Sequence, residues 1–312
     1  MGEPELDLSQ TPPHWGMNFT KTIHASPNAT TDPSTVRLPP GYTVVLIGAG
    51  KGIGEHAAKA YLLAKATNII ITSRTSTDLD RVKKDLDNLA SQIGHNATIA
   101  TLAQDATKPE SYKQLTQLLE HSFGGRLDTL VFCAGGGPVT SLWTPNIDTT
   151  EIDEWHESMA INFTGSYYAA RYLVPLMLRP ESVGKTIVNI SSAASHFAGG
   201  NITPAPYSIG KLALNRLTQI LGENYAGQGL TVVAVHPGSS ATPGALGCMP
   251  ESLHNILTDD QGLCGAVCVW ISKQKRDWIS GRYICATWDM DELEAKKDEI
   301  LKDDKLKFRM VV

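Results

Sequence analysis

The sequence predicts an α/β fold in which a doubly wound, parallel sheet of about seven strands is covered by helices on both faces, in a single domain. Two observations lead to this prediction. From residue 43 onward, short runs rich in β-branched residues alternate with longer amphipathic runs, which indicates βαβ units. The strand runs, such as TLVFCA and TVVAV, are almost continuously apolar, as burial on both faces of a parallel sheet requires.

The elements are expected to follow one another in regular alternation. The expected strands span residues 43–48, 68–73, 97–102, 128–133, 185–191, 230–236 and 282–285. The expected helices span residues 53–66, 78–93, 109–122, 150–178, 206–226 and 261–273. No internal repeat or domain-sized linker interrupts this rhythm, so residues 41–288 are interpreted as one domain.

Three segments depart from the alternation. Residues 1–40 are rich in Pro, Thr, Ser and Asn and are expected to form an irregular arm on the surface or on a partner subunit. Residues 289–312 are interpreted as a C-terminal tail. The segment 237–260 combines Pro, Gly and small apolar residues, and an irregular stretch of that length is usually a lid or binding loop. A substrate lid is therefore expected at about residues 239–260.

Composition excludes several classes of function. The 312 residues carry a net charge of −5, which gives no electrostatic footprint for nucleic acid or an anionic membrane. No apolar run approaches the roughly 20 residues that span a bilayer. Five cysteines, an odd number, without a secretory signal indicate reduced thiols and a cytoplasmic protein. Cys264 and Cys268 are one helical turn apart, but no second ligand pair accompanies them, so no metal site is expected.

The glycine-rich stretch IGAGKGIG leaves the first expected strand and begins the first expected helix. Glycines at such a turn let backbone N–H groups and the helix N-terminus approach a pyrophosphate, as in Rossmann-like folds. Gly48, Gly52 and Gly54 fit the pattern G-x-x-x-G-x-G, with Gly50 in addition. Ile53 stands where the commoner G-x-G-x-x-G needs a glycine, and no P-loop Gly-Lys-Ser/Thr follows. The alternative is a turn in which glycine serves packing alone.

The end of the second expected strand indicates which dinucleotide is bound. An NAD site usually places Asp or Glu there to hold the ribose 2′-hydroxyl. This sequence has Ser73, Arg74 and Thr75 instead. A guanidinium suits a dianionic 2′-phosphate, and Lys51 in the glycine loop adds a second positive charge. NADP(H) is therefore expected in preference to NAD(H), although a single surface arginine is often only solvated.

A second group of residues carries acid–base chemistry. Tyr207 and Lys211 are four residues apart and share one helix face. A phenol titrates at about 10, and a neighbouring ammonium favours the phenolate and makes it useful as a base. Ser192, at the end of the fifth strand, can donate to a substrate carbonyl oxygen, with Ser191 as a weaker candidate. Asn162 lies in an apolar stripe, and its alternative is a satisfied polar residue of the core.

Together these motifs resemble the short-chain dehydrogenase/reductase family over about residues 43–286. IGAGKGIG is similar to the family's T-G-x-x-x-G-x-G loop, with Ile47 for the usual Thr. The family's catalytic residues fall on Asn162, Ser192, Tyr207 and Lys211. Ser192 precedes Tyr207 by more than the usual spacing, which we interpret as an insertion in HFAGGNITPAP.

The resemblance also implies a cofactor site. It implies that Asp105 contacts the adenine and that Thr242, after Pro237-Gly238, contacts the nicotinamide carboxamide. The full set of expected cofactor contacts is Gly48, Gly50, Lys51, Gly52, Ile53, Gly54, Ser73, Arg74, Thr75, Asp105, Ala134, Gly135, Asn162, Tyr207, Lys211, Pro237, Gly238 and Thr242. Phe132 and Cys133 depart from the family's L-V-N-N-A-G, in which both positions are asparagine. The long arm and the tail WDMDELEAKKDEI resemble fungal members, which suggests secondary metabolism.

The expected function is that of an NADP(H)-dependent oxidoreductase that reduces a ketone or aldehyde, or oxidises the alcohol, of a small and largely apolar metabolite. Tyr207 is expected to be the general acid and base. Two alternatives stay open: a non-redox isomerase or cyclase that holds NADP(H), and a catalytically silent cofactor sensor. The resemblance implies a homodimer or homotetramer formed through the helices at 150–178 and 206–226. The expected walls of the substrate pocket are Trp143, Phe197, Leu246 and Met249, which in the alternative only pack the lid onto the core.

Overall fold

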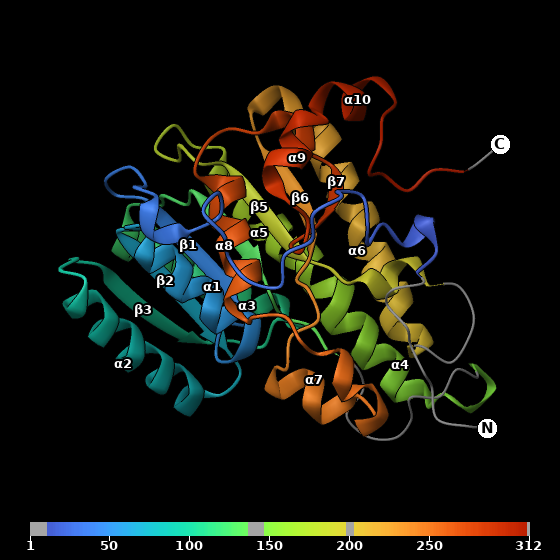
Figure 1. The fold of residues 1–312 in the computed structure, drawn as a ribbon. Coiled ribbons are helices and arrows are strands. Elements are labelled where there is room, and N and C mark those ends of the chain that lie inside the picture. The colour runs from blue at the N-terminus through green and yellow to red at the C-terminus, as the bar shows by residue number, and fades with distance from the viewer. Residues whose placement is uncertain (1–10, 137–146, 198–202, 311–312) are drawn as a thin grey trace.

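The computed structural model describes residues 11–136, 147–197 and 203–310, so the expected pocket residue Trp143 lies outside the described part. Seven parallel strands form one sheet in the order β3-β2-β1-β4-β5-β6-β7, which confirms the predicted doubly wound, Rossmann-like fold (Figure 1). The strands are β1 (Thr43–Ile47), β2 (Asn68–Ser73), β3 (Thr98–Ala103), β4 (Thr129–Phe132), β5 (Thr186–Ile190), β6 (Thr231–His236) and β7 (Arg282–Cys285).

Helices connect the strands and cover both faces of the sheet (Figure 1). Within the described ranges they are α1 (Gly52–Leu63), α2 (Ser76–Gln92), α3 (Pro109–Phe123), α4 (Ile152–Met159), α5 (Gly165–Met177), α6 (Ala205–Asn224), α7 (Pro243–Cys248), α8 (Gly262–Ser272), α9 (Met290–Ala295) and α10 (Lys297–Lys302). The order of strands changes direction between β1 and β4, and open α/β sheets bind ligands beside such a point.

The strand side chains alternate between two hydrophobic cores, one on each face of the sheet. Val44 and Leu46 of β1 pack with α1, α2 and α8. Val45 and Ile47 of the same strand pack with α3, α5 and α6. All five β1 residues are buried, which explains why the strand reads as a continuous apolar run rather than an alternating one.

The prediction of a single helix at residues 150–178 is wrong, because the structure has two helices there. The segment consists of α4 and α5, separated by a π-helical turn, η5 (Ala160–Thr164). Where α5 begins, the helix lies against the sheet: a Cβ on Gly165 would be 2.7 Å from the carbonyl oxygen of Ala106 and 3.1 Å from the ring of Phe132. A π-turn adds a residue to the helical turn and changes where side chains point, and such turns are frequent at functional sites. Asn162 lies within this one.

Phe132 and Cys133, which replace the family's asparagines, are compatible with regular sheet pairing. Phe132 is fully buried between the sheet and α5, in the space that the missing side chain of Gly165 leaves open. The Cys133 N–H still donates to Ile47 O at 2.8 Å. Polar bridging between this part of the sheet and the helices comes from Asn189 of β5, which accepts from Ser166 Oγ at 2.9 Å and donates to Thr218 Oγ1 at 2.9 Å.

The lid segment is less irregular than expected, because it contains two short helices, α7 and η8 (Glu251–Ile256). Thr242 caps α7: its hydroxyl accepts from Ala245 N–H at 3.1 Å, and proline occupies the first helical position. The two ends of the lid are held together by an antiparallel bridge between Ser240 and Thr258. The lid therefore leaves β6 and returns to α8 as a closed loop.

The arm and the tail lie together beside β7, where Figure 1 shows the arm in blue and the tail in red. Ile23 and Trp288 form an isolated antiparallel bridge, and His24 N–H donates to Thr287 O at 2.7 Å. The tail is helical in part, at α9 and α10. The domain boundaries at residues 40/41 and 288/289 stay predictions.

Neither a membrane helix nor a metal-binding group is found in the part of the chain that the structure describes. None of its helices has both the length and the apolar character needed to cross a bilayer. No three His, Cys, Asp or Glu side chains in it are grouped closely enough to hold a metal ion.

Candidate active site

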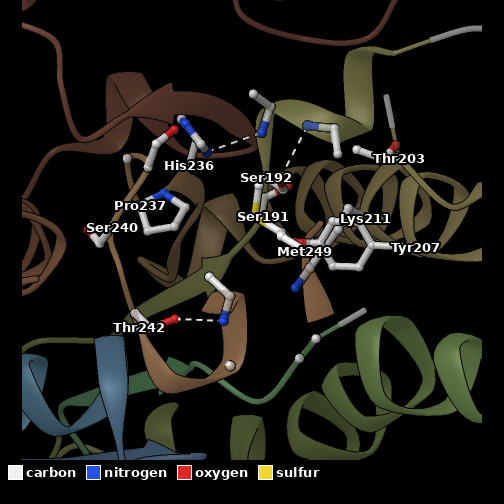
Figure 2. Close-up of a pocket in the computed structure, with 18 of the residues that line it drawn as sticks. Ser191, Ser192, Thr203, Tyr207, Lys211, His236, Pro237, Ser240, Thr242 and Met249 are labelled. Atoms are coloured by element: carbon white, nitrogen blue, oxygen red, sulfur yellow. Dashed lines mark hydrogen bonds between the residues drawn. The ribbon is translucent and has the colours of Figure 1, made fainter. Parts of the chain in front are cut away.

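A cavity of about 260 Å³ lies at the carboxyl edge of the sheet, where Cys133, Ile190 and His236 come from three neighbouring strand ends. Helix α6 and the lid close it from the other sides. Figure 2 shows Tyr207 and Lys211 together on α6, facing Ser192, with Pro237, Ser240 and Thr242 following the chain out of β6. Residues far apart in the sequence thus meet at the position where ligands bind in open α/β sheets.

Tyr207 and Lys211 share one face of α6, as their spacing predicts. The Lys211 ammonium lies 5.8 Å from the centre of the Tyr207 ring and donates to Ile190 O at 2.9 Å. The Ser192 hydroxyl lies close enough to the Tyr207 phenol to lower its pKa, and it accepts from Ala194 N–H at 3.1 Å. The three groups therefore converge at one end of the cavity.

Burial away from water is the largest influence on the pKa values of Tyr207 and Lys211. It raises the pKa of Tyr207 above its ordinary value, and the nearby Ser192 hydroxyl opposes it only in part. It lowers the pKa of Lys211 to about 8. That the positive charge of Lys211 lowers the pKa of Tyr207 stays a prediction. The ammonium is turned toward the carbonyl of Ile190 rather than toward the phenol oxygen.

The geometry separates the two neighbouring serines. Ser191 is buried, and its hydroxyl donates to Asn215 Oδ1 at 2.6 Å. The Asn215 amide in turn donates to Ser195 Oγ at 2.9 Å, so the Ser191 hydroxyl is engaged in a hydrogen-bond network, although the residue is part of the cavity lining. Ser192 keeps its hydroxyl on the cavity side, beside Tyr207.

Asn162 is fully buried and fully hydrogen-bonded. Its amide nitrogen donates to Gly136 O at 2.8 Å and to Ser158 O at 3.0 Å, and its amide oxygen accepts from Gly136 N–H at 3.1 Å. The side chain therefore fixes the chain just after β4. A Cβ on the adjacent Gly135 would lie 2.9 Å from Asn162 Oδ1 and 2.7 Å from Lys211 Nζ, so a larger residue there would displace one of these side chains.

The glycine loop is held in place by neighbouring backbone. The N–H groups of Gly48 and Ala49 both donate to Thr72 O, at 2.9 and 2.8 Å. A Cβ on Gly48 would lie 2.6 Å from the backbone nitrogen of Ala134, and one on Gly54 would lie 2.8 Å from Ala49 Cα. These glycines are required by the close approach of main chain to main chain, which is the packing reason for the motif.

The same loop also presents an open helix end. Gly52 has φ +60°, in the left-handed region that favours glycine, and α1 begins there. Lys51 occupies the N-cap position, but its side chain makes no capping hydrogen bond. The first N–H groups of a helix have no partner within the helix and bind anions readily, which fits the pyrophosphate of a dinucleotide. Ile53, which follows Gly52 in the first turn of α1, lines the cavity.

The positively charged residues expected at the 2′-phosphate are exposed. Arg74 and Lys51 form no ion pair within residues 11–136, 147–197 and 203–310. Ser73 adjoins the glycine loop, since a Cβ on Gly50 would lie 2.6 Å from its Oγ. Thr75 precedes α2 as its N-cap residue.

Asp105, the expected adenine contact, has one carboxylate oxygen engaged. That oxygen accepts from the N–H and the hydroxyl of Thr107, at 2.9 and 2.8 Å. Partial burial raises the pKa of Asp105, but Thr107 and the positive charge of Arg74 outweigh it, so the net shift is downward. The carboxylate lies after β3, two strands from the glycine loop.

The remaining expected contacts lie around the cavity mouth. Pro237, Gly238 and Gly135 line it, whereas Ala134 packs under Gly48. Thr242 also lines it, on the side facing the glycine loop: a Cβ on Gly52 would lie 3.2 Å from Thr242 Cβ. Because the Thr242 hydroxyl accepts from Ala245, its own proton remains available for donation.

His236, at the end of β6, was not expected from the sequence. Its Nδ1 accepts from Ala193 N–H at 3.1 Å, so in the neutral ring the proton is on Nε2. Burial lowers the pKa of His236 to about 4, with His196 acting in the same direction. The ring is therefore uncharged at neutral pH.

Two of the expected pocket walls line the cavity, and two residues that do so were missed. Phe197 and Met249 are part of the lining, whereas Leu246 is not and is 44% exposed. Trp15 and Met17, in the arm, are part of the lining. The sequence offered only a tryptophan and a methionine in the Pro- and Thr-containing stretch TPPHWGMNFT as a hint of them.

Comparison with known proteins assigns the chain to a family. The family model "short chain dehydrogenase" matches residues 42–247. The chain belongs to the short-chain dehydrogenase family. It is 77% identical to short chain dehydrogenase pgmD of Aspergillus terreus over 312 residues, covering 100% of both chains. It is 36% identical to short chain dehydrogenase mpl6 of Monascus purpureus over 273 residues, covering 87% of this chain and 89% of that one.

Solved structures share the fold of this short-chain dehydrogenase. A short chain dehydrogenase of Shigella flexneri complexed with NADP superposes with a TM-score of 0.67 at 23% identity, covering 80% of this chain and 98% of that one. A 3-oxoacyl-[acyl-carrier protein] reductase of Brucella melitensis gives a TM-score of 0.67 at 22% identity, covering 92% and 99%. The family implies a nicotinamide cofactor, and the glycine loop, the uncapped N-terminus of α1 and the cavity beside them fit one.

Proposed function

We propose that this chain is an NADP(H)-dependent oxidoreductase that reduces the ketone or aldehyde of a small, largely apolar metabolite, or oxidises the corresponding alcohol. The observation that carries the proposal is the meeting of the Ser192 hydroxyl, the Tyr207 phenol and the Lys211 ammonium at one end of an apolar cavity. A pair of oxygen donors beside a buried cation is what a carbonyl oxygen needs when it becomes an alkoxide.

The cofactor, when bound, supplies or accepts the hydride at its nicotinamide ring. The protein handles the proton. In reduction, Ser192 donates a hydrogen bond to the carbonyl oxygen, and Tyr207 transfers its phenolic proton to that oxygen as negative charge develops. In oxidation, the Tyr207 phenolate takes the proton back. Because burial holds the Tyr207 pKa above its ordinary value, the protonated form that reduction needs predominates at neutral pH.

Lys211 and Asn162 support this step. Lys211 is a buried cation whose ammonium faces Gly135, on the side of the cavity that adjoins the glycine loop. Its charge stabilises the phenolate left after proton transfer, and its donors can hold a ribose hydroxyl. Asn162 holds Gly136 by two hydrogen bonds and so fixes the main chain against which Lys211 rests. The family resemblance also implies that Asn162 keeps a water in place for proton relay to Lys211, and this stays a prediction.

The preference for NADP(H) rests on charge. Arg74 and Lys51 carry positive charge at the end of β2 and in the glycine loop, where an NAD site usually has an acidic residue. The Shigella flexneri structure is complexed with NADP, whereas another Brucella melitensis reductase of this fold, at 24% identity, has bound NAD, so the fold alone does not distinguish the two.

The test is NADPH oxidation with a panel of ketones and aldehydes, in the wild type and in Tyr207→Phe. Loss of the general acid should lower kcat about 10²–10⁴-fold while NADPH binding, followed by nicotinamide fluorescence, is retained. Tyr225→Phe, the same change at the C-terminal end of α6 and outside the cavity, is the matched control and should keep full activity.

Each alternative function gives a different result. A product formed without net oxidation of NADPH would indicate an isomerase or cyclase. NADPH binding with no turnover of any carbonyl compound would indicate a sensor. Tyr207→Phe with undiminished kcat would remove the residue roles proposed above and leave only the family assignment.

A further inference from the structure

The arm reaches the active-site cavity, and its contribution rests on two side chains. Trp15 and Met17 line the cavity together with residues from β5, β6, α6 and the lid. Trp15 is 9% exposed, and its ring packs against Phe197, with the ring centres 4.1 Å apart at an angle of 44°. Phe197 follows Ser192 by one short helical turn, η6 (Ala193–His196). The arm and the Ser192 segment therefore form one aromatic wall.

The backbone of the arm is fixed between these two side chains. Gly16, with φ +70°, ends the short helix η2 (Pro13–Trp15) and turns the chain. The Trp288 indole N–H donates to Gly16 O at 2.9 Å and to Met17 O at 3.2 Å. Trp288 is itself buried, so the anchor is part of the core. Trp15 and Met17 are thus held at the cavity on both sides of a hydrogen-bonded turn.

The tail fastens the arm farther along. The Glu292 carboxylate accepts from the N–H of Lys21, at 2.7 Å, and from the N–H and the hydroxyl of Thr22, at 3.2 and 2.6 Å. His24 Nε2 lies 2.8 Å from Asp289 Oδ2. Contacts spread along residues 21–24 indicate a segment with one defined position rather than a loose end.

The composition of the cavity wall indicates what it binds. Aromatic rings come from the arm side, through Trp15 and Phe197, and aliphatic side chains such as Leu253 and Ile256 come from the lid. The polar donors Ser192 and Tyr207 lie at one end. A tryptophan beside an apolar slot binds flat apolar groups through stacking and large contact area. A ligand that fits is a carbonyl compound whose reacting group is attached to a flat, apolar body.

We propose that Trp15 and Met17 contact the substrate and set its specificity, selecting ketones or aldehydes with a flat aromatic or polycyclic body. This inference rests on the proposed function, because it assigns the body of the substrate whose carbonyl meets Ser192 and Tyr207. Trp15 and Met17 act on the body and not on the reacting carbon. Removing them should therefore weaken the use of a flat substrate and leave a small one unaffected.

The experiment compares two methyl ketones with the same reacting group: 2-acetonaphthone, which has a flat body, and butan-2-one, which has none. For Trp15→Ala, kcat/KM for 2-acetonaphthone should fall about tenfold through KM, as expected from the apolar contact area that an indole provides. The value for butan-2-one should change less than twofold. Met17→Ala should act in the same direction, and Trp15→Phe should recover most of the loss. Ile23→Ala, an exposed arm residue that does not line the cavity, is the matched control and should change neither ketone.

The outcomes separate this inference from the proposed function. An equal fall for both ketones in a folded Trp15→Ala variant would overturn the specificity role and indicate only structural support. No change for either ketone, or turnover of butan-2-one alone by the wild type, would overturn it as well. If the wild type reduces neither ketone, equilibrium binding of 2-acetonaphthone by calorimetry decides. Tenfold weaker binding to Trp15→Ala would support the inference even without turnover of these two ketones. Absence of binding to the wild type would overturn the inference, whereas the proposed reaction is decided by the panel of ketones and aldehydes.

Discussion

Replacement of Arg74 by alanine tests how this chain distinguishes NADPH from NADH. Arg74 is exposed at the end of β2 and forms no ion pair within the described ranges. It helps to lower the pKa of Asp105. The variant should therefore fold normally, and a change in cofactor binding can be assigned to the lost guanidinium.

The magnitude follows from the kind of interaction that is removed. A hydrogen bond to a charged group contributes about 1.5–3 kcal/mol. Solvent and salt screen an exposed pair such as this one, which favours the lower end of that range. At about 1.4 kcal/mol for each factor of ten, the Kd for NADPH should rise about tenfold. The Kd for NADH, which lacks the 2′-phosphate, should stay within about twofold.

The assay is a titration with each cofactor, followed by nicotinamide fluorescence, at low and high salt. Arg81→Ala is an instructive control, because Arg81 braces the glycine loop: it donates to Gly50 O at 3.0 Å and to Glu55 at 2.7 Å. Its loss should weaken both cofactors alike. An unchanged ratio of the two affinities in Arg74→Ala, or tighter binding of NADH by the wild type, would refute the assignment of Arg74 to the phosphate.

Three further predictions concern the ionisation, the loop and the assembly. The kcat/KM of carbonyl reduction should be constant below about pH 8 and fall above it, because Lys211 has a pKa of about 8 and loses its charge as the pH rises. A profile of kcat/KM that is flat to pH 10 would contradict this. Gly54→Ala should weaken both cofactors and lower Tm by several degrees, since its Cβ would lie 2.8 Å from Ala49 Cα, whereas Gly227→Ala, with nothing within 4 Å, should do neither. We also propose that α5 and α6 form a subunit interface, because the apolar side chains of Tyr167, Leu212 and Ile220 are 47%, 40% and 45% exposed. Light scattering should show a dimer or tetramer of the wild type, and Leu212→Glu should dissociate it. A monomeric wild type would contradict this proposal.

The sheet and the main helices were predictable because burial on both faces leaves a direct mark on the sequence. Runs such as Thr43–Ile47 and Thr231–His236 are buried throughout and mostly apolar, and polar or glycine-rich stretches separate them. The split between α4 and α5 was not predictable. Helix α5 begins at Gly165 in close contact with Phe132 and Ala106, and no local pattern in the sequence reports such a tertiary contact.

The residues of the candidate site were predictable where the chemistry requires a fixed local spacing. Tyr207 and Lys211 are one helical turn apart, and the glycine loop occupies a single turn between strand and helix. The arm residues Trp15 and Met17 have no such spacing. They reach the cavity through Trp288 at the opposite end of the chain, and no pattern in one sequence reports a contact of that range. The lid helix α7 was missed because it has only six residues, and its only signals are the cap Thr242 and the proline that follows it.

The neutral His236 has a consequence for which molecules the cavity admits. The lining within the described residues contains no Asp, Glu or Arg, and His236 stays uncharged because its pKa is about 4. Lys211 supplies the positive charge, and its ammonium is already bound to Ile190 O. A carboxylate or phosphate that entered would leave its hydration shell without an equivalent partner, at a cost of several kcal/mol. We therefore expect selection to act on ionisation state before it acts on shape: an ester or a neutral ketone should enter the cavity from water, and the free acid of the same skeleton should stay outside.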